Sequence, residues 1–90
     1  KKTVTIVVGG LVQGVGFRYF VQSLAKKYNL NGYVKNLYTG EVEIEVEGDE
    51  NILKPFIEQV KIGPMFSQVT SFSIEEREYE NKYSNFKVKY

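Results

Sequence analysis

Residues 41–47 alternate strictly between acidic and β-branched side chains, and this pattern constrains the fold more than any other feature of the chain. The apolar positions are Val42, Ile44 and Val46, and the acidic positions are Glu41, Glu43, Glu45 and Glu47. Successive side chains of a strand point to opposite faces of its sheet, so the pattern predicts a sheet with one buried face and one solvated face. The rest of the chain must then cover one sheet face and no more.

Two amphipathic helices are expected to provide this cover. From Phe17 to Tyr28, apolar residues recur at intervals of three and four, which places them on one side of a helix. A second stripe of the same kind begins near Asn51 and ends before Gly63 and Pro64, which stop a helix. The remaining strands are predicted at residues 3–8 (before two glycines), 33–36, 69–76 and 86–90. Most of the tyrosines and phenylalanines fall on these stripes and alternations and are expected in the core.

The resulting order, β-α-β-β-α-β-β, defines an α+β two-layer sandwich, the ferredoxin-like arrangement with an additional C-terminal strand. Its sheet is mostly antiparallel and carries both helices on one face. The first two strands run parallel with the third between them, so their C-terminal ends share one edge of the sheet. The loop after the first strand and the hairpin at residues 37–40 are therefore expected to be neighbours. We expect a single domain spanning residues 1–90.

Composition removes several kinds of chemistry. The chain has no His and no Cys among its 90 residues, which excludes histidine bases, thiolate nucleophiles and zinc fingers. All eleven acidic residues lie between Glu41 and Glu80, so residues 1–40 offer no carboxylate to a metal ion. No segment is apolar enough to span a membrane, and the start does not resemble a signal peptide. We expect a cytoplasmic protein that binds no membrane.

The segment 9–18 is the candidate functional loop, because it holds four glycines and leads from a strand into a helix. Backbone amides in such a loop can converge on an anion at the helix N-terminus. Arg18 falls in the first helical turn, where a cation is unfavourable unless an anion is bound beside it. On the residues alone, an anion site and a solvated arginine beside a glycine turn remain equally open.

Two motifs give a more specific indication. The run Gly10–Arg18 (GLVQGVGFR) resembles the signature of the acylphosphatase family, and Gly32–Asn36 (GYVKN) resembles its second motif. The glycine at position 40, the glycine-proline pair and the last strand also fit, so the resemblance covers essentially the whole chain. One position departs from the family pattern: Leu11 stands where the family usually has Arg or Lys, so one positive charge is absent.

The resemblance implies a role for each motif. The backbone amides of Gln13, Gly14, Val15, Gly16, Phe17 and Arg18, with the Arg18 side chain, would hold a phosphoryl group, and Asn36 would orient the attacking water. The substrate would be a small acyl phosphate, cleaved to a carboxylate and to inorganic phosphate, which would also inhibit as product. We expect no cofactor, no metal ion and no nucleic-acid partner, and we expect a monomer.

This reaction suits a chain without histidine. The leaving group is a carboxylate with a pKa of about 4, close to that of a glutamate side chain, so it departs without a strong general acid. Phosphoryl transfer then requires mainly positioning and charge stabilisation. No side chain stands out as the base, and we expect a phosphoryl oxygen of the substrate to take the proton of the water.

Other interpretations remain open at this point. Asn36 taken alone is more often a turn residue that bonds its own backbone. An RNA-recognition module shares the element order, although the aromatic motifs are misplaced and the glutamates of residues 41–47 would repel phosphates. A non-catalytic regulatory domain, or a domain excised from a larger protein that uses carbamoyl phosphate, is a further alternative.

Overall fold

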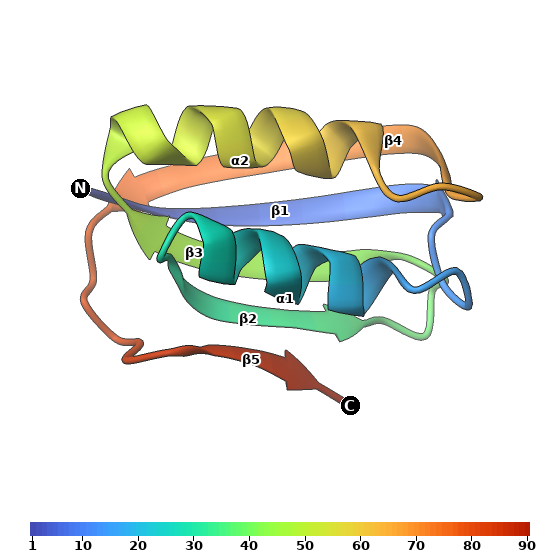
Figure 1. Ribbon diagram of the computed structural model, residues 1–90, viewed down its shortest axis with the longest axis horizontal. Coiled ribbons are helices and arrows are strands. Elements are labelled where there is room, and N and C mark those ends of the chain that lie inside the picture. The colour runs from blue at the N-terminus through green and yellow to red at the C-terminus, as the bar shows by residue number, and fades with distance from the viewer.

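The computed structural model describes residues 1–90, and its five strands and two helices follow the predicted order (Figure 1). In chain order the elements are β1 (Lys2–Leu11), α1 (Phe17–Lys27), β2 (Asn31–Asn36), β3 (Val42–Gly48), α2 (Glu50–Ile62), β4 (Gln68–Glu78) and β5 (Phe86–Lys89). Both helices cover the same face of the sheet (Figure 1). This arrangement confirms the two-layer, ferredoxin-like α+β sandwich with an additional C-terminal strand.

The strand order across the sheet is β4-β1-β3-β2-β5. Strands β1 and β2 each pair antiparallel with β3, so they run parallel to each other with β3 between them. Strand β5 pairs parallel with β2 at the sheet edge. The C-terminal ends of β1, β2 and β5 consequently lie at one end of the molecule, where α1 also begins (Figure 1). The predicted proximity of the loop after β1 and the hairpin after β2 follows from this pairing.

The core fills the space between the sheet and the two helices. Its fully buried side chains include Val4, Ile6 and Val8 of β1, Phe17 and Val21 of α1, Val42, Ile44 and Val46 of β3, and Phe56 and Val60 of α2. Each such side chain stabilises the fold by about 1.5–3 kcal/mol relative to its exposed state. The alternation of residues 41–47 thus predicted the apolar face of β3 correctly.

The helix-free face of the sheet differs from the prediction. Glu45 and Glu47 are only 7% and 4% exposed, so half of the expected solvated row is buried. Arg77 and Tyr83 both donate hydrogen bonds to the Glu45 carboxylate. Glu47 accepts from the Thr3 hydroxyl at 2.8 Å and from two backbone N–H groups of the segment 79–85, which joins β4 to β5. Alternation identified the face, but it could not reveal that a distant segment covers it.

The end of β1 also differs from the prediction. The strand continues past Gly9 and Gly10 to Leu11, and a β-bulge between the two glycines shifts its register against β4. Gly10 has a φ of 119°, and a Cβ added there would lie 2.2 Å from the carbonyl oxygen of Gln68. Glycine is therefore required at position 10 by both conformation and close approach. The two glycines mark a bulge within the strand and not its end.

The aromatic residues divide between the core and the surface. Phe17, Phe56 and Phe86 are buried, as expected, whereas Tyr19, Tyr38 and Tyr90 are among the most exposed side chains of the molecule. The expectation that most aromatic residues are core is therefore wrong, because no tyrosine is buried and Phe66 is 80% exposed as well. Tyrosine carries a hydroxyl that favours a wet surface, so periodicity alone places it less reliably than phenylalanine.

Candidate active site

The loop of residues 12–16 joins β1 to α1 through two left-handed positions. Gly14 and Gly16 have φ angles of 76° and 79°, a region that costs an L-residue with a side chain about 1–2 kcal/mol. A Cβ added at either position would meet no atom within 4 Å. The glycines are thus required by the backbone conformation, which sets the path of the loop into α1.

The backbone N–H groups from Gln13 to Tyr19 are free of protein partners. None of them donates a hydrogen bond, and α1 begins at Gly16 without a side-chain cap. The first intrahelical bond is accepted by the Gly16 carbonyl from Phe20, at 3.0 Å. Uncapped N–H groups at a helix start carry the positive end of the helix dipole. The loop and the first turn of α1 therefore present a continuous set of donors suited to an anion.

Arg18 is held beside these donors by the last strand. Its Nη1 donates to the carbonyl oxygen of Lys89 at 3.3 Å, and its guanidinium carbon lies 4.6 Å from the centre of the Tyr90 ring. A guanidinium group has five N–H donors, so most of them remain available to a ligand. A cation in the first turn of a helix opposes the dipole, and an anion bound between the two would reverse that cost.

Asn36 is the last residue of β2 and faces the same pocket. A pocket of about 150 Å³ is lined by Val12, Gly14, Gly16, Phe17, Arg18, Tyr19 and Asn36. The side-chain oxygen Oδ1 of Asn36 is buried and has no hydrogen-bond partner, and it is the only buried side-chain polar atom of the protein in that state. Leaving such an acceptor unpaired costs about 1–3 kcal/mol, which a bound water or ligand would recover. The structure thus brings Arg18, the glycine loop and Asn36 together.

Gln13 has a structural task that the sequence did not reveal. Its side-chain Nε2 donates to the carbonyl oxygens of Leu37, at 2.6 Å, and of Glu41, at 2.8 Å. Both carbonyls belong to the hairpin that directly follows Asn36. The Gln13 side chain therefore ties the glycine loop to the hairpin and fixes the loop amides relative to Asn36. The topology predicted that the two loops meet, but not which side chain connects them.

The other residues of the first motif occupy distinct positions. Phe17 is buried in the core and anchors the start of α1, while Val15 packs against the edge of the core. Leu11 ends β1 opposite Gln68, is exposed, and does not line the pocket. Position 11, where the family usually has Arg or Lys, therefore lies outside the pocket lining. No carboxylate lines the pocket, and no three metal-ligating side chains gather anywhere in the structure.

A groove of about 350 Å³ adjoins the pocket on the hairpin side. It is lined by Lys35, Asn36, Leu37, Tyr38, Thr39 and Tyr90, and it shares Asn36 with the pocket. Interaction with the Tyr19 side chain raises the pKa of Tyr90 above its ordinary value. Tyrosine side chains thus line both the pocket and the adjoining groove.

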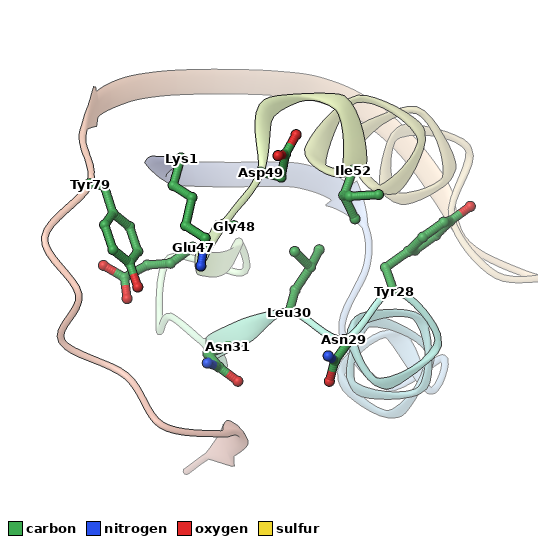
Figure 2. Close-up of a pocket in the computed structure, with 10 residues that line it drawn as sticks. All are labelled: Lys1, Tyr28, Asn29, Leu30, Asn31, Glu47, Gly48, Asp49, Ile52 and Tyr79. Atoms are coloured by element: carbon green, nitrogen blue, oxygen red, sulfur yellow. The ribbon is translucent and has the colours of Figure 1, made fainter.

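A second hollow, of about 240 Å³, lies at the opposite end of the sheet (Figure 2). Its walls come from the end of α1, the start of β2 and the start of α2, with Leu30 and Ile52 as apolar lining. The Glu47 carboxylate at its edge is already bonded to Thr3 and the segment 79–85. Lys1 lies over the Tyr79 ring, 5.5 Å from its centre. This hollow has no unpaired buried acceptor, so it is not the candidate active site.

The fold and the pocket together define a ferredoxin-like α+β sandwich with unpaired hydrogen-bond donors at the start of α1. The chain belongs to the acylphosphatase family, whose family model, described as Acylphosphatase, matches residues 4–88. It is 45% identical over 89 residues to the acylphosphatase of Geobacillus kaustophilus, covering 99% of this chain and 95% of that protein.

Solved structures show the same likeness. The crystal structure of acylphosphatase from Bacillus subtilis superposes with a TM-score of 0.96 and 48% identity, and each chain is covered over its full length. The crystal structure of HypF from T. kodakarensis matches with a TM-score of 0.85 and 37% identity, covering 100% of this chain but 12% of that one. Neither helix of this chain is long and apolar enough to cross a membrane.

Proposed function

We propose that this protein hydrolyses acyl phosphates to a carboxylate and inorganic phosphate by direct attack of water on phosphorus. The observation that carries the proposal is the convergence of unpaired hydrogen-bonding groups on one pocket. The free N–H groups of Gln13 to Arg18 and the Arg18 guanidinium are donors, and the buried Oδ1 of Asn36 is an acceptor. Such a set complements a phosphoryl group and a water molecule at once.

The donors would bind the equatorial oxygens of the phosphoryl group. Negative charge on these oxygens persists through a loose transition state, so fixed N–H groups stabilise it without reorganisation. Arg18 contributes a planar pair of donors that matches two phosphoryl oxygens, which the single ammonium group of a lysine does not. The contact from Lys89 and the stacking against Tyr90 keep this planar group in place before the substrate arrives.

Asn36 would position the nucleophile. Its Oδ1 would accept a hydrogen bond from a water molecule, which would place the water oxygen beside the phosphorus atom. As the new bond from this oxygen to phosphorus forms, the bond from phosphorus to the acyl oxygen breaks, and the electron pair leaves with the carboxylate. The proton of the water passes to a phosphoryl oxygen of the substrate. Neither a covalent intermediate nor a side-chain acid is required.

The proposal includes three further statements about the protein. Inorganic phosphate would inhibit as a product, because it occupies the same donors as the substrate. The reaction would proceed without a metal ion, since residues 1–40, which supply all the proposed site residues, contain no carboxylate. The protein would act as a monomer of one domain, because every proposed group comes from the same chain.

The experiment is to follow release of inorganic phosphate from benzoyl phosphate and from carbamoyl phosphate. Turnover of benzoyl phosphate that is inhibited competitively by phosphate and unaffected by a chelator is the expected result. A domain specialised for carbamoyl phosphate, which the sequence left open, is the second candidate, and the likeness to 12% of the HypF chain shows that such a fold also occurs within a larger protein. Turnover of carbamoyl phosphate alone would favour that candidate, and inertness toward both substrates would refute the proposed hydrolysis.

A further inference from the structure

Three exposed tyrosines surround the proposed phosphoryl site. Tyr19, Tyr38 and Tyr90 are 64%, 98% and 90% exposed. Tyr19 lines the pocket itself, whereas Tyr38 and Tyr90 line the adjoining groove. Single exposed aromatic side chains are normal on a protein surface. Their concentration around Arg18 and Asn36 is a separate observation, because the acyl part of a substrate must also be accommodated at this mouth.

Two of these tyrosines flank the Arg18 side chain. The Tyr90 ring lies on the Arg18 guanidinium, with the guanidinium carbon 4.6 Å from the ring centre. Tyr19 follows Arg18 in the first turn of α1 and lines the pocket together with it. We call Tyr19 and Tyr90 the tyrosine rim. The rim lies directly beside the guanidinium that would hold the phosphoryl group, whereas Tyr38 belongs to the hairpin after β2.

The geometry of the proposed reaction distinguishes the rim from the hairpin. In phosphoryl transfer the attacking and leaving oxygens lie roughly in line, on opposite sides of phosphorus. Asn36 ends β2 of the sheet and Tyr19 lies in the first turn of α1, so the two residues line the pocket from different layers. The acyl oxygen would leave on the side away from Asn36, and Tyr19 is the exposed tyrosine that lines this pocket, whereas Tyr38 does not.

We propose that the tyrosine rim binds the acyl group of the substrate and gives the enzyme a preference for acyl phosphates with an aromatic acyl group. This inference rests on the proposed hydrolysis of acyl phosphates. A planar, apolar acyl group would pack on the Tyr19 ring, while a small acyl group such as acetyl would barely reach it. The contact exists in both the bound substrate and the transition state, so it lowers KM and leaves kcat nearly unchanged.

The test compares benzoyl phosphate with acetyl phosphate. Steady-state kcat and KM are measured for the wild type, Tyr19→Ala, Tyr19→Phe and the matched control Tyr38→Ala, together with the inhibition constant of inorganic phosphate. We expect Tyr19→Ala to reduce the ratio of kcat/KM for benzoyl over acetyl phosphate about threefold to tenfold, through KM, as loss of one aromatic contact predicts. Tyr19→Phe keeps the ring and should retain the wild-type ratio, as should Tyr38→Ala.

Each alternative result has a definite meaning. A fall of the ratio in Tyr38→Ala but not in Tyr19→Ala would overturn the proposal and place the acyl group in the hairpin groove. An equal loss for both substrates in Tyr19→Ala, with weaker phosphate inhibition, would also overturn it, because Tyr19 would then act through Arg18. If the wild type releases phosphate from neither substrate, the proposed hydrolysis itself fails, which is a different outcome from an unchanged ratio in an active enzyme.

Discussion

The two helices of this molecule begin in opposite ways. At the start of α2, the carboxylate of Asp49 accepts a hydrogen bond from the N–H of Asn51 at 2.8 Å, and Glu50 adds a negative charge in the first turn. At the start of α1, Gly16 provides no cap, no acidic residue follows, and Arg18 adds a positive charge. The start of α2 is therefore capped by a side chain of its own sequence, whereas the N–H groups at the start of α1 remain available to an anion.

The same contrast extends to the two ends of the sheet. At the closed end, where α2 begins, the carboxylates of Glu45 and Glu47 interact with Thr3, Arg77, Lys82 and Tyr83. All buried side-chain polar atoms of this cluster have partners. The open end, where α1 begins, holds the unpaired Oδ1 of Asn36. Buried polar groups that have hydrogen-bond partners stabilise a fold, and those without partners are available to a ligand. Substitutions at the two ends should therefore affect different measurements.

The largest expected effect is at the open end, in Arg18→Lys. Because a lysine keeps the charge but loses the planar pair of donors, we expect kcat/KM for benzoyl phosphate to fall about 10³-fold. The free energy of unfolding should change by no more than about 0.5 kcal/mol, as for other half-exposed sites. Phosphate release and urea unfolding measure the two quantities. Activity close to that of the wild type would exclude the proposed role of the guanidinium.

Asn36→Ala should distinguish the positioning of the water from the binding of the phosphoryl group. We expect kcat to fall about 10²-fold because the nucleophile is no longer positioned, while the inhibition constant of inorganic phosphate stays the same. Removing an unpaired buried acceptor should not reduce stability. The matched control is Asn31→Ala at the other end of β2, where Nδ2 donates to the carbonyl of Tyr83 at 3.3 Å.

Asn31→Ala should lower stability by about 1 kcal/mol and leave kcat unchanged. If phosphate inhibition weakens in parallel with kcat in Asn36→Ala, then Asn36 is a structural turn residue and its proposed role is wrong.

At the closed end, Glu45→Ala should affect stability alone. It leaves Arg77 and Tyr83 without their shared partner, and breaking a buried ion pair costs about 3–5 kcal/mol. Glu75→Ala is the control, because Glu75 also contacts Arg77, at 3.1 Å, but its side chain is 73% exposed. The exposed pair should contribute less than about 1 kcal/mol. Equal destabilisation by the two variants in urea titrations would show that burial of Glu45 is not what stabilises the closed end.

The open end could be predicted from the sequence further than the closed end. Local patterns determine the open end: two glycines with positive φ, a cation in the first turn, and strand pairing that brings Asn36 to the same edge. The closed end depends on the segment 79–85, which has no periodicity and reaches Glu45 and Glu47 from far along the chain. The Gln13 side chain escaped prediction for the same reason, because its partners are backbone carbonyls, which every residue offers.

The smallest expected effect is the pH dependence of stability that the closed end imparts. Burial alone would raise the pKa of Glu45, but the hydrogen bonds from Tyr83 and Arg77 and the charge of Lys82 outweigh it and hold the pKa below its ordinary value of 4.5. Protonation thus favours the unfolded chain, so this stabilisation is present above about pH 4.5 and is lost as the pH falls through the folded-state pKa. Glu45→Gln cannot titrate at this position and should flatten the acid limb of unfolding free energy against pH. Identical acid limbs in the wild type and the variant would mean that the charge of Glu45 does not stabilise the closed end, and that its hydrogen bonds alone do so.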